Sequence, residues 1–515
     1  METVTISKAE YEELQVLKAQ NADLLQRVDF LLQQMRLARH KQFGSSSEKS
    51  EYDQLSLFDE AEATADANTS EPTVTEVQAH MRKKPAQGLE KLPEGLPVEI
   101  IEYTLPEAEQ ACPACGHGLH VIGKNVRETL KLIPAKAVIE RHIQYVYGCR
   151  DCEQNACEVP IIKAPMEPPL IAGSIATAEA VTMLLTQKFV LGVPLYRQEQ
   201  EWNRNGIPLS RQTMSNWLLR CAEDYLVPIY EQLHRLLLQR EVLHADETTL
   251  QVLHEEGKTP QSKSYMWLYR TGGDGGPPIV LYEYQPDRKA ERPREFLKGF
   301  RGYLHTDGYS GYHNLPEGVT VVGCWAHARR KFDEAMKGLP EKAQAGSMSM
   351  RAKQYCDRLF ALEREFIELS AEERTQKRQE QSRPILEEFF RWLRAQNAST
   401  KSAFGGAVHY ALEQREYLSR YLLDGRLEIS NNRAERSIKP FVIGRKNFLF
   451  ANTPRGAKAS AVMYSLIETA KESGISPYDY LAWVLKAAPQ MNLRQDSLLA
   501  DRLLPARFAD ESGAV

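Results

Sequence analysis

The chain has 515 residues, of which 42% are hydrophobic and 26% are charged, and its formal net charge is −4 at pH 7. This length exceeds what one hydrophobic core supports, so several domains are expected. The sequence has no apolar run of about 18 residues or more and no secretory signal pattern at its start, so we expect a cytoplasmic protein. An acidic net charge alone disfavours nucleic-acid binding, although local basic clusters can outweigh it.

Apolar residues near the start of the chain recur every seven residues. One core position of the heptad is occupied by Leu17, Leu24 and Leu31, and the other by Leu14, Asn21, Val28 and Met35. The repeat predicts a coiled coil over residues 1–43, in which Asn21 sets the register of a dimer. An amphipathic helix that packs on its own chain is the alternative, because the repeat lasts only ~3 to 4 heptads. Residues 44–98 are polar and acidic, which predicts a flexible linker.

Two CxxC pairs lie in the next segment, residues 99–165. Their cysteines are Cys112, Cys115, Cys149 and Cys152. Two residues between thiolates let both sulfurs reach one metal ion, so we expect a β-rich domain with a structural, tetrahedral Zn²⁺ site. A redox role is the alternative reading of a single pair. Cys157 follows closely, as either a bystander or a substitute ligand.

Helical patterns separated by turn signals fill residues 166–236. The expected helices run from Thr177 to Val190, from Leu195 to Arg204 and onward from a cap at Ser210. A short turn with a glycine before a capped helix is typical of a helix-turn-helix, and its reading helix would offer Arg211, Gln212 and Asn216 to DNA. A small helical domain with no DNA-binding role shows the same pattern.

Strand patterns mixed with helices fill residues 237–475. The expected strands are Glu241–Asp246, Ser264–Arg270, Pro278–Tyr284, Tyr303–Asp307 and Val319–Cys324. Three strands in a meander, followed by a helix, a strand, a helix and a strand, predict a ribonuclease-H-like α/β domain in which the first and fourth strands are neighbours. A charged helical insertion is expected at about residues 333–400, and a helical tail at residues 476–515. The whole is a multidomain α+β chain.

The first and fourth of these strands end in the same pattern, a His followed two residues later by an Asp. The pairs are His244 with Asp246 and His305 with Asp307. Side chains two apart share a face of a strand, so neighbouring strands would bring both carboxylates together, and a downstream helix would add Glu435. Three carboxylates suit one or two Mg²⁺ or Mn²⁺ ions for phosphodiester chemistry, so Asp246, Asp307 and Glu435 are the expected metal ligands and catalytic residues. The two histidines are expected to support the site, because Mg²⁺ prefers oxygen ligands.

Other residues near these acids carry expectations of their own. Glu247 should point to the opposite face of its strand, so it is left out of the metal set. Basic residues expected to contact DNA phosphates are Arg329, Arg330, Arg436, Lys439, Arg445 and Lys446. The nearby Phe441, Phe448 and Phe450 are read first as core and second as base-stacking residues. His327 would either approach the scissile phosphate or make a structural hydrogen bond.

Several different short motifs are spread along nearly the whole chain. They comprise residues 41–44, 46–49, 245–248, 305–309, 324–332, 431–436 and 443–447, together with the two CxxC pairs. In these motifs the sequence resembles the insertion-sequence 66 transposases of bacteria. The resemblance implies a ribonuclease-H-like fold with an Asp-Asp-Glu triad at Asp246, Asp307 and Glu435. It further implies element-end and target DNA as partners and a nucleoid-associated location during activity, and it leaves open a need for small accessory proteins. The N-terminal coiled coil predicts a homodimer or higher homo-oligomer.

Two other functions compete with transposition. A non-catalytic DNA-binding regulator would account for the coiled coil, the CxxC pairs and the helix-turn-helix, but not for the acid-bearing strands. A nuclease of the same fold would use the same metal ions without joining strands. Metal-dependent nicking separates the first from transposition, and strand transfer separates the second.

Overall fold

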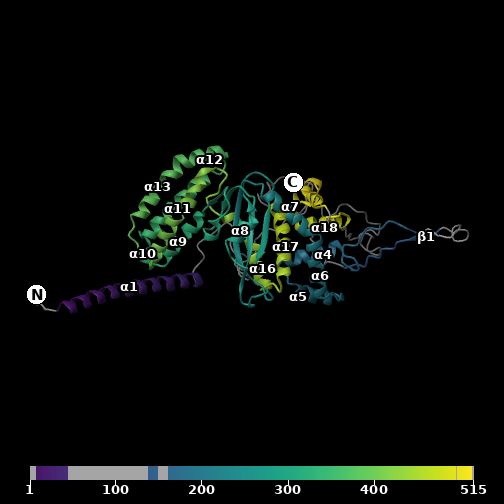
Figure 1. Cartoon of the computed structure of the whole chain (residues 1–515), viewed down its shortest axis with the longest axis horizontal. Coiled ribbons are helices and arrows are strands. Elements are labelled where there is room, and N and C mark those ends of the chain that lie inside the picture. Colours follow the sequence, from purple (N-terminus) through teal and green to yellow (C-terminus); the bar gives the residue numbers. More distant parts are fainter. Residues whose placement is uncertain (1–6, 44–136, 149–160, 494–495, 513–515) are drawn as a thin grey trace, which may run out of the picture. The chain divides into compact units, whose positions relative to one another are not determined.

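The computed structural model describes residues 7–43, 137–148, 161–493 and 496–512 (Figure 1). The chain forms two compact units, one of residues 46–164 and one of residues 1–45 with 165–515. The expected linker lies outside the described residues. So do all the cysteines of the expected zinc domain, namely Cys112, Cys115, Cys149, Cys152 and Cys157.

The described part of the smaller unit contains one β-hairpin. Its strands, β1 (Val146–Gly148) and β2 (Ile161–Lys163), pair antiparallel with Val146 opposite Lys163. The β-rich character expected for this domain agrees with that pairing.

The first helix, α1 (Lys8–Phe43), is continuous through the whole heptad repeat. Its apolar stripe is exposed, with Leu17 56%, Leu24 59% and Leu31 59% accessible to solvent. The expected helix is confirmed. Its self-association stays a prediction, which the uncovered stripe supports because leucines at a and d positions are normally buried by a second helix.

A set of short helices follows in the larger unit. These are α4 (Ala178–Leu185), η2 (Thr186–Val190), α5 (Leu195–Arg204), α6 (Arg211–Cys221), η3 (Ala222–Leu226) and α7 (Val227–Leu237). Ser210 caps α6, as expected, and Thr177, which was expected as the first residue of its helix, caps α4; the side chain of each accepts a hydrogen bond from a backbone N–H group. Gly206, with φ of 78°, turns the chain between α5 and α6. The expected helices and turn are therefore confirmed.

The sheet of the larger unit has the order β5-β4-β3-β6-β7. Its strands are β3 (Val242–Gln251), β4 (Lys263–Thr271), β5 (Val280–Gln285), β6 (Gly302–His305) and β7 (Val319–Val322), with α8 (Glu291–Phe296) between β5 and β6. The first three strands are antiparallel, whereas β6 runs parallel to β3, and β7 runs parallel to β6. The predicted neighbourhood of the first and fourth strands is confirmed.

Three strand ends differ from the sequence expectation. β7 stops at Val322, two residues before the expected end at Cys324, and the helix expected between the fourth and fifth strands is only a short 3-10 helix, η4 (Ser310–Tyr312). β3 continues past Asp246 to Gln251, because β4 pairs with it along that whole length. β6 stops at His305, before Asp307. Gly308 has φ of 93°, and the Asp307 side chain accepts a hydrogen bond from Tyr309 N at 2.9 Å, so the chain turns there instead of extending.

Two helices from later in the sequence, α16 (Asn432–Phe448) and α17 (Pro454–Glu472), pack against the sheet (Figure 1). Strand β5 is an edge strand, and α17 satisfies its outward N–H groups. Thr469 Oγ1 accepts from Val280 N at 3.0 Å, and Ser465 Oγ accepts from Tyr282 N at 2.8 Å. A helix thus covers a sheet edge that would otherwise be open to pairing.

A long helical segment lies between β7 and α16 in the sequence. It contains α9 (Trp325–Lys337), α10 (Glu341–Gln344), α11 (Met348–Glu365), α12 (Ala371–Lys377), η5 (Arg378–Ser382), α13 (Arg383–Arg394), α14 (Ala403–Glu413), α15 (Arg415–Ser419) and η6 (Arg420–Leu423). These helices bury a second core around Trp325, Phe332 and Phe389. The expected insertion is present, but its helices continue well beyond residue 400 and enclose a core of their own.

The C-terminal helices pack on the same core as the sheet and the helices before it. They are α18 (Pro477–Ala487), η7 (Ala488–Gln490), η8 (Ser497–Leu503) and α19 (Pro505–Ser512). Among the described helices, none is both long and apolar enough to cross a membrane.

Candidate functional site

Asn431 connects three elements where α16 begins. Its backbone N donates to Cys324 Sγ at 3.1 Å, and its side-chain Nδ2 donates to the Ala245 carbonyl of β3 at 2.8 Å. Its Oδ1 is hydrogen-bonded to His244 Nδ1 at 2.9 Å. Because Glu435 lies one helical turn further on, with its N–H bonded to the Asn431 carbonyl at 3.2 Å, these bonds position Glu435 beside the sheet.

The carboxyl group of Asp246 lies on β3 among other acids. Burial raises the pKa of Asp246 well above its usual value, and the charges of Glu247, Asp307 and Glu435 raise it further. A hydrogen bond from Glu247 N to Asp246 Oδ1, at 2.8 Å, opposes this rise. Asp307 and Glu435 are therefore near enough to act on Asp246, although they are distant in sequence.

The three acids do not form one tight ligand cluster. Within the described part of the chain, the group whose ligand atoms all lie within 4.8 Å of one another consists of Cys324, His327 and Glu435. Glu435 Oε1 lies 3.7 Å from His327 Nδ1, and Glu435 Oε2 lies 3.5 Å from Arg330 Nη2. Burial lowers the pKa of His327, which favours its neutral form. Burial also raises the pKa of Cys324 to about 12.

Asp307 borders an open pocket of about 690 Å³. The pocket also includes Arg288, His327 and Lys331, and its far wall comes from α14 and α15 of the helical insertion. Tyr410 of that insertion donates from its hydroxyl to the Asp307 carbonyl at 3.0 Å. The sequence reading gave the insertion no role, yet the structure brings it to the site.

Glu247 is hydrogen-bonded to two partners, Arg288 and Tyr312. Its side chain is 1% exposed, Arg288 Nε donates to its Oε1 at 2.7 Å, and Tyr312 OH donates to its Oε2 at 2.7 Å. Burial raises the pKa of Glu247, and Asp307 raises it further. Both of its carboxylate oxygens are therefore engaged, which agrees with leaving it out of the metal set. Arg288 was missed, because nothing local marks a loop arginine as the partner of a strand residue.

His244 and His305 are fully buried behind the acids and stack on each other. Burial lowers the pKa of His244 to about 3 and that of His305 well below its usual value, so both rings are neutral. His244 bonds to Asn431, and neither nitrogen of His305 has a hydrogen-bond partner.

The expected DNA-contacting cations near Glu435 differ in their surroundings, and one of them, Arg330, lies with its Nη2 3.5 Å from Glu435 Oε2. Arg436, Lys439 and Lys446 are exposed on α16 and available for phosphate contacts. Arg445 instead donates to the side chains of Thr248 and Thr249, at 3.2 Å each, and so fastens α16 to β3.

Arg329 and the three phenylalanines of this region also differ in their surroundings. Arg329 pairs with Asp357 of α11, with 2.6 Å between Nε and Oδ1. Phe441 is buried, as expected for a core residue, whereas Phe448 is half-buried and Phe450 is exposed.

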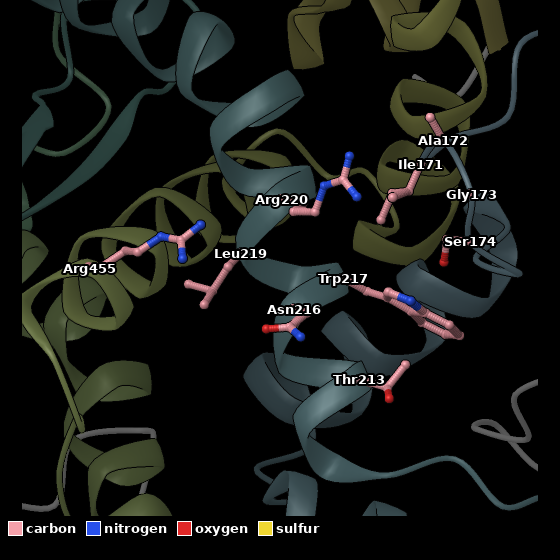
Figure 2. A pocket seen from close by; sticks show the side chains of 10 residues that line it. All are labelled: Ile171, Ala172, Gly173, Ser174, Thr213, Asn216, Trp217, Leu219, Arg220 and Arg455. Atoms are coloured by element: carbon pink, nitrogen blue, oxygen red, sulfur yellow. The ribbon is translucent and has the colours of Figure 1, made fainter.

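The exposed face of α6 carries the residues expected to read DNA. Arg211, Gln212 and Asn216 are exposed, and so is Arg220, which lies one turn beyond Asn216 and was not anticipated. Figure 2 shows Asn216 and Arg220 beside a pocket of about 330 Å³, with Arg455 at the start of α17 on its other side. Spacing of four residues puts Gln212, Asn216 and Arg220 in one row.

Comparison with known families covers most of the chain. A family model described as "Transposase IS66 family" matches residues 173–459, and one described as "IS66 C-terminal element" matches residues 465–505. A "zinc-finger binding domain of transposase IS66" matches residues 109–153, which supports a structural zinc ion. "Transposase C of IS166 homeodomain" matches residues 31–101.

Curated relatives align over nearly their full lengths. The uncharacterized protein y4jD of Sinorhizobium fredii (strain NBRC 101917 / NGR234) is 32% identical over 448 residues, which is 84% of this chain and 84% of that protein. The uncharacterized protein y4qI of the same strain is 31% identical over 504 residues, or 92% of this chain and 88% of that protein. Together with the family models, these matches show that the chain belongs to the IS66 family of transposases.

Proposed function

We propose that this chain cuts the ends of a mobile DNA element and joins the freed 3′-hydroxyl to target DNA by metal-dependent phosphoryl transfer. Asp246, Asp307 and Glu435 are its proposed catalytic residues. The observation that carries this proposal is structural: β6, which leads to Asp307, pairs with β3, which carries Asp246, and Asn431 holds the start of the helix that carries Glu435 against β3. Asp307 and Glu435 also raise the pKa of the buried Asp246 carboxyl. Three acids from separate elements that repel one another in a fold are a common sign of a cation site.

A ribonuclease-H-like fold for the domain is part of the proposal. An antiparallel meander of three strands with two parallel strands added beside the first supports it. In this arrangement Asp246 lies within β3 and Asp307 lies in the turn two residues after the end of β6, which is the parallel neighbour of β3.

The residues present fit a divalent cation with oxygen ligands. Asp246 is buried among other carboxylates, so a cation held by Asp246, Asp307 and Glu435 would relieve the cost of that burial. Bound there, Mg²⁺ or Mn²⁺ would supply activation of a water or a 3′-hydroxyl and stabilisation of the leaving oxygen.

Neighbouring residues position the three acids and supply positive charge beside them. Asn431 holds the start of α16 against β3, and this contact fixes the position of the Glu435 backbone one turn further along the helix. Arg288 neutralises Glu247, so this fourth acid does not compete for the cation. Lys331 lines the pocket beside Asp307 and offers a positive charge to a DNA phosphate.

DNA would be held by surfaces on either side of this site. We assign the row of Gln212, Asn216 and Arg220, with Arg211, to end recognition, and the exposed Arg436, Lys439 and Lys446 to phosphate contacts near the acids. The uncovered leucine stripe of α1 supports a homodimer or higher homo-oligomer.

The proposed division of the chain follows the sequence. Its parts are a coiled coil (1–43), a linker (44–98), a zinc domain (99–165), a helix-turn-helix-like domain (166–236), a catalytic domain (237–475) and a helical tail (476–515).

One assay separates this proposal from its competitors. Purified full-length protein is incubated with labelled element-end DNA and a target plasmid, with Mg²⁺, with Mn²⁺ and with chelator. Transposition predicts metal-dependent nicks at the element end and joined products. Nicks without joined products would favour a nuclease, and binding without nicks would favour a regulator.

A further inference from the structure

A second group of ligand atoms lies beside the three acids. Cys324 is the residue before α9, and His327 is in the first turn of that helix, so their spacing of three places both on one side of it. Glu435 reaches the same point from α16. The Cys324 sulfur, a His327 ring nitrogen and a Glu435 oxygen all lie within 4.8 Å of one another.

Two of these atoms lack any hydrogen-bond partner. His327 Nδ1 and Glu435 Oε1 are both buried and unpartnered, and they lie 3.7 Å apart. Buried polar atoms are nearly always paired, so an unpartnered pair facing each other indicates a missing ligand between them. Arg330 approaches the other carboxylate oxygen, Oε2, which leaves Oε1 free for that ligand.

We propose that Cys324 Sγ, His327 Nδ1 and Glu435 Oε1 bind one transition-metal ion of the Zn²⁺ class. Sulfur, imidazole nitrogen and carboxylate oxygen are the ligands that Zn²⁺ uses in proteins, whereas Mg²⁺ disfavours sulfur and nitrogen. Three protein ligands leave a fourth position open in a tetrahedral site.

Neighbouring backbone supports this assignment. Asn431 N donates to Cys324 Sγ at 3.1 Å, and such a bond orients a metal-binding sulfur from outside the ligand set. The proposed ion differs from both the structural zinc of the CxxC domain and the oxygen-bound cation of the three acids. It shares only Glu435 with the latter, and its existence does not depend on the proposed strand-transfer activity.

The test counts metal ions bound to the full-length chain. Protein is equilibrated with Zn²⁺ by dialysis, and bound zinc is measured by elemental analysis. Cys324→Ser is compared with Cys356→Ser, a matched control in which another fully buried cysteine, on α11, loses its sulfur. We expect Cys324→Ser to bind one ion fewer per chain than the wild type, and Cys356→Ser to bind as many as the wild type.

Cobalt provides a second readout that identifies the ligand. Co²⁺ bound at the proposed site should show thiolate-to-metal charge-transfer absorption, and the share due to this site should vanish in Cys324→Ser. His327→Gln gives the same comparison without altering the buried sulfur, and it decides the question if Cys324→Ser does not fold. Equal metal content and equal absorption in the wild type and in the folded variants would overturn the proposal.

Discussion

His244 and His305 stack face to face between neighbouring parallel strands, with ring centroids 4.4 Å apart and planes within 10° of each other. Each precedes, by two residues, one of the acids proposed to bind metal. The stacked pair therefore lies where β3 and β6 pair, two residues before Asp246 and Asp307.

The first prediction concerns this stack. His305 is buried and neutral, and neither of its ring nitrogens has a hydrogen-bond partner. His305→Phe keeps a flat ring and removes two unpaired polar atoms, so stability in urea should rise or change by less than about 1 kcal/mol. His244→Phe is the matched comparison, and it should cost about 1–3 kcal/mol because it leaves the buried Asn431 Oδ1 without its hydrogen-bond partner. A larger loss for His305→Phe than for His244→Phe would contradict this account.

The second prediction is a dependence of stability on pH. Burial raises the pKa of Glu283, on β5, from 4.5 to about 7. The folded state therefore binds more protons than the unfolded state between these values, and the contribution of Glu283 to stability falls as pH rises through that window. Glu283→Gln should remove this fall and stabilise the protein at pH 8 by up to about 3 kcal/mol. Urea unfolding at pH 5 and pH 8 measures the difference, and an unchanged pH dependence would contradict the assignment.

The third prediction tests Asn431 as a positioning residue. Asn431→Ala removes its side-chain bonds to Ala245 and His244, so Glu435 is held less well. Strand cleavage should fall about 10–100-fold, and the Mg²⁺ concentration for half-maximal rate should rise, while binding of element-end DNA stays. Asn432→Ala changes the exposed neighbouring residue and is the control. A parallel loss of DNA binding and thermal stability, with no shift in metal dependence, would indicate a purely structural role.

The fourth prediction concerns the recognition surface. Arg220→Ala removes an exposed cation from the row on α6, so affinity for element-end DNA should fall, and the slope of log affinity against log salt should flatten by about 1. Arg235→Ala, an exposed arginine on α7, should leave both quantities unchanged. Equal effects of the two variants would remove α6 from the DNA-binding surface.

Much of the framework was predictable because its signals are local. Alternation along the strands and their order in the chain predicted that β3 and β6 are neighbours, and a cap at Ser210 predicted the start of α6. Exact strand ends were not predictable. The stop of β6 at His305 depends on the turn made by Asp307 and Gly308, which only the folded chain displays.

Side-chain partners across long separations could not be read from the sequence. Arg288, from the loop after β5, donates a hydrogen bond to Glu247 of β3. Arg445 donates hydrogen bonds to Thr248 and Thr249, although its position in the sequence suggested a DNA contact. Tyr410 reaches Asp307 from an insertion whose sequence shows only charged helices. Tertiary packing decides each of these contacts, and no periodicity encodes it.

The most direct test of the central claim is strand cleavage by Asp246→Asn on labelled element-end DNA. Glu283→Gln is the matched control, because it replaces another buried carboxyl of the same sheet by an amide, on the outer strand. We predict that Asp246→Asn binds the DNA as the wild type does but loses cleavage and joining by at least about 1,000-fold, whereas Glu283→Gln retains both. Cleavage by Asp246→Asn at the wild-type rate would contradict the account.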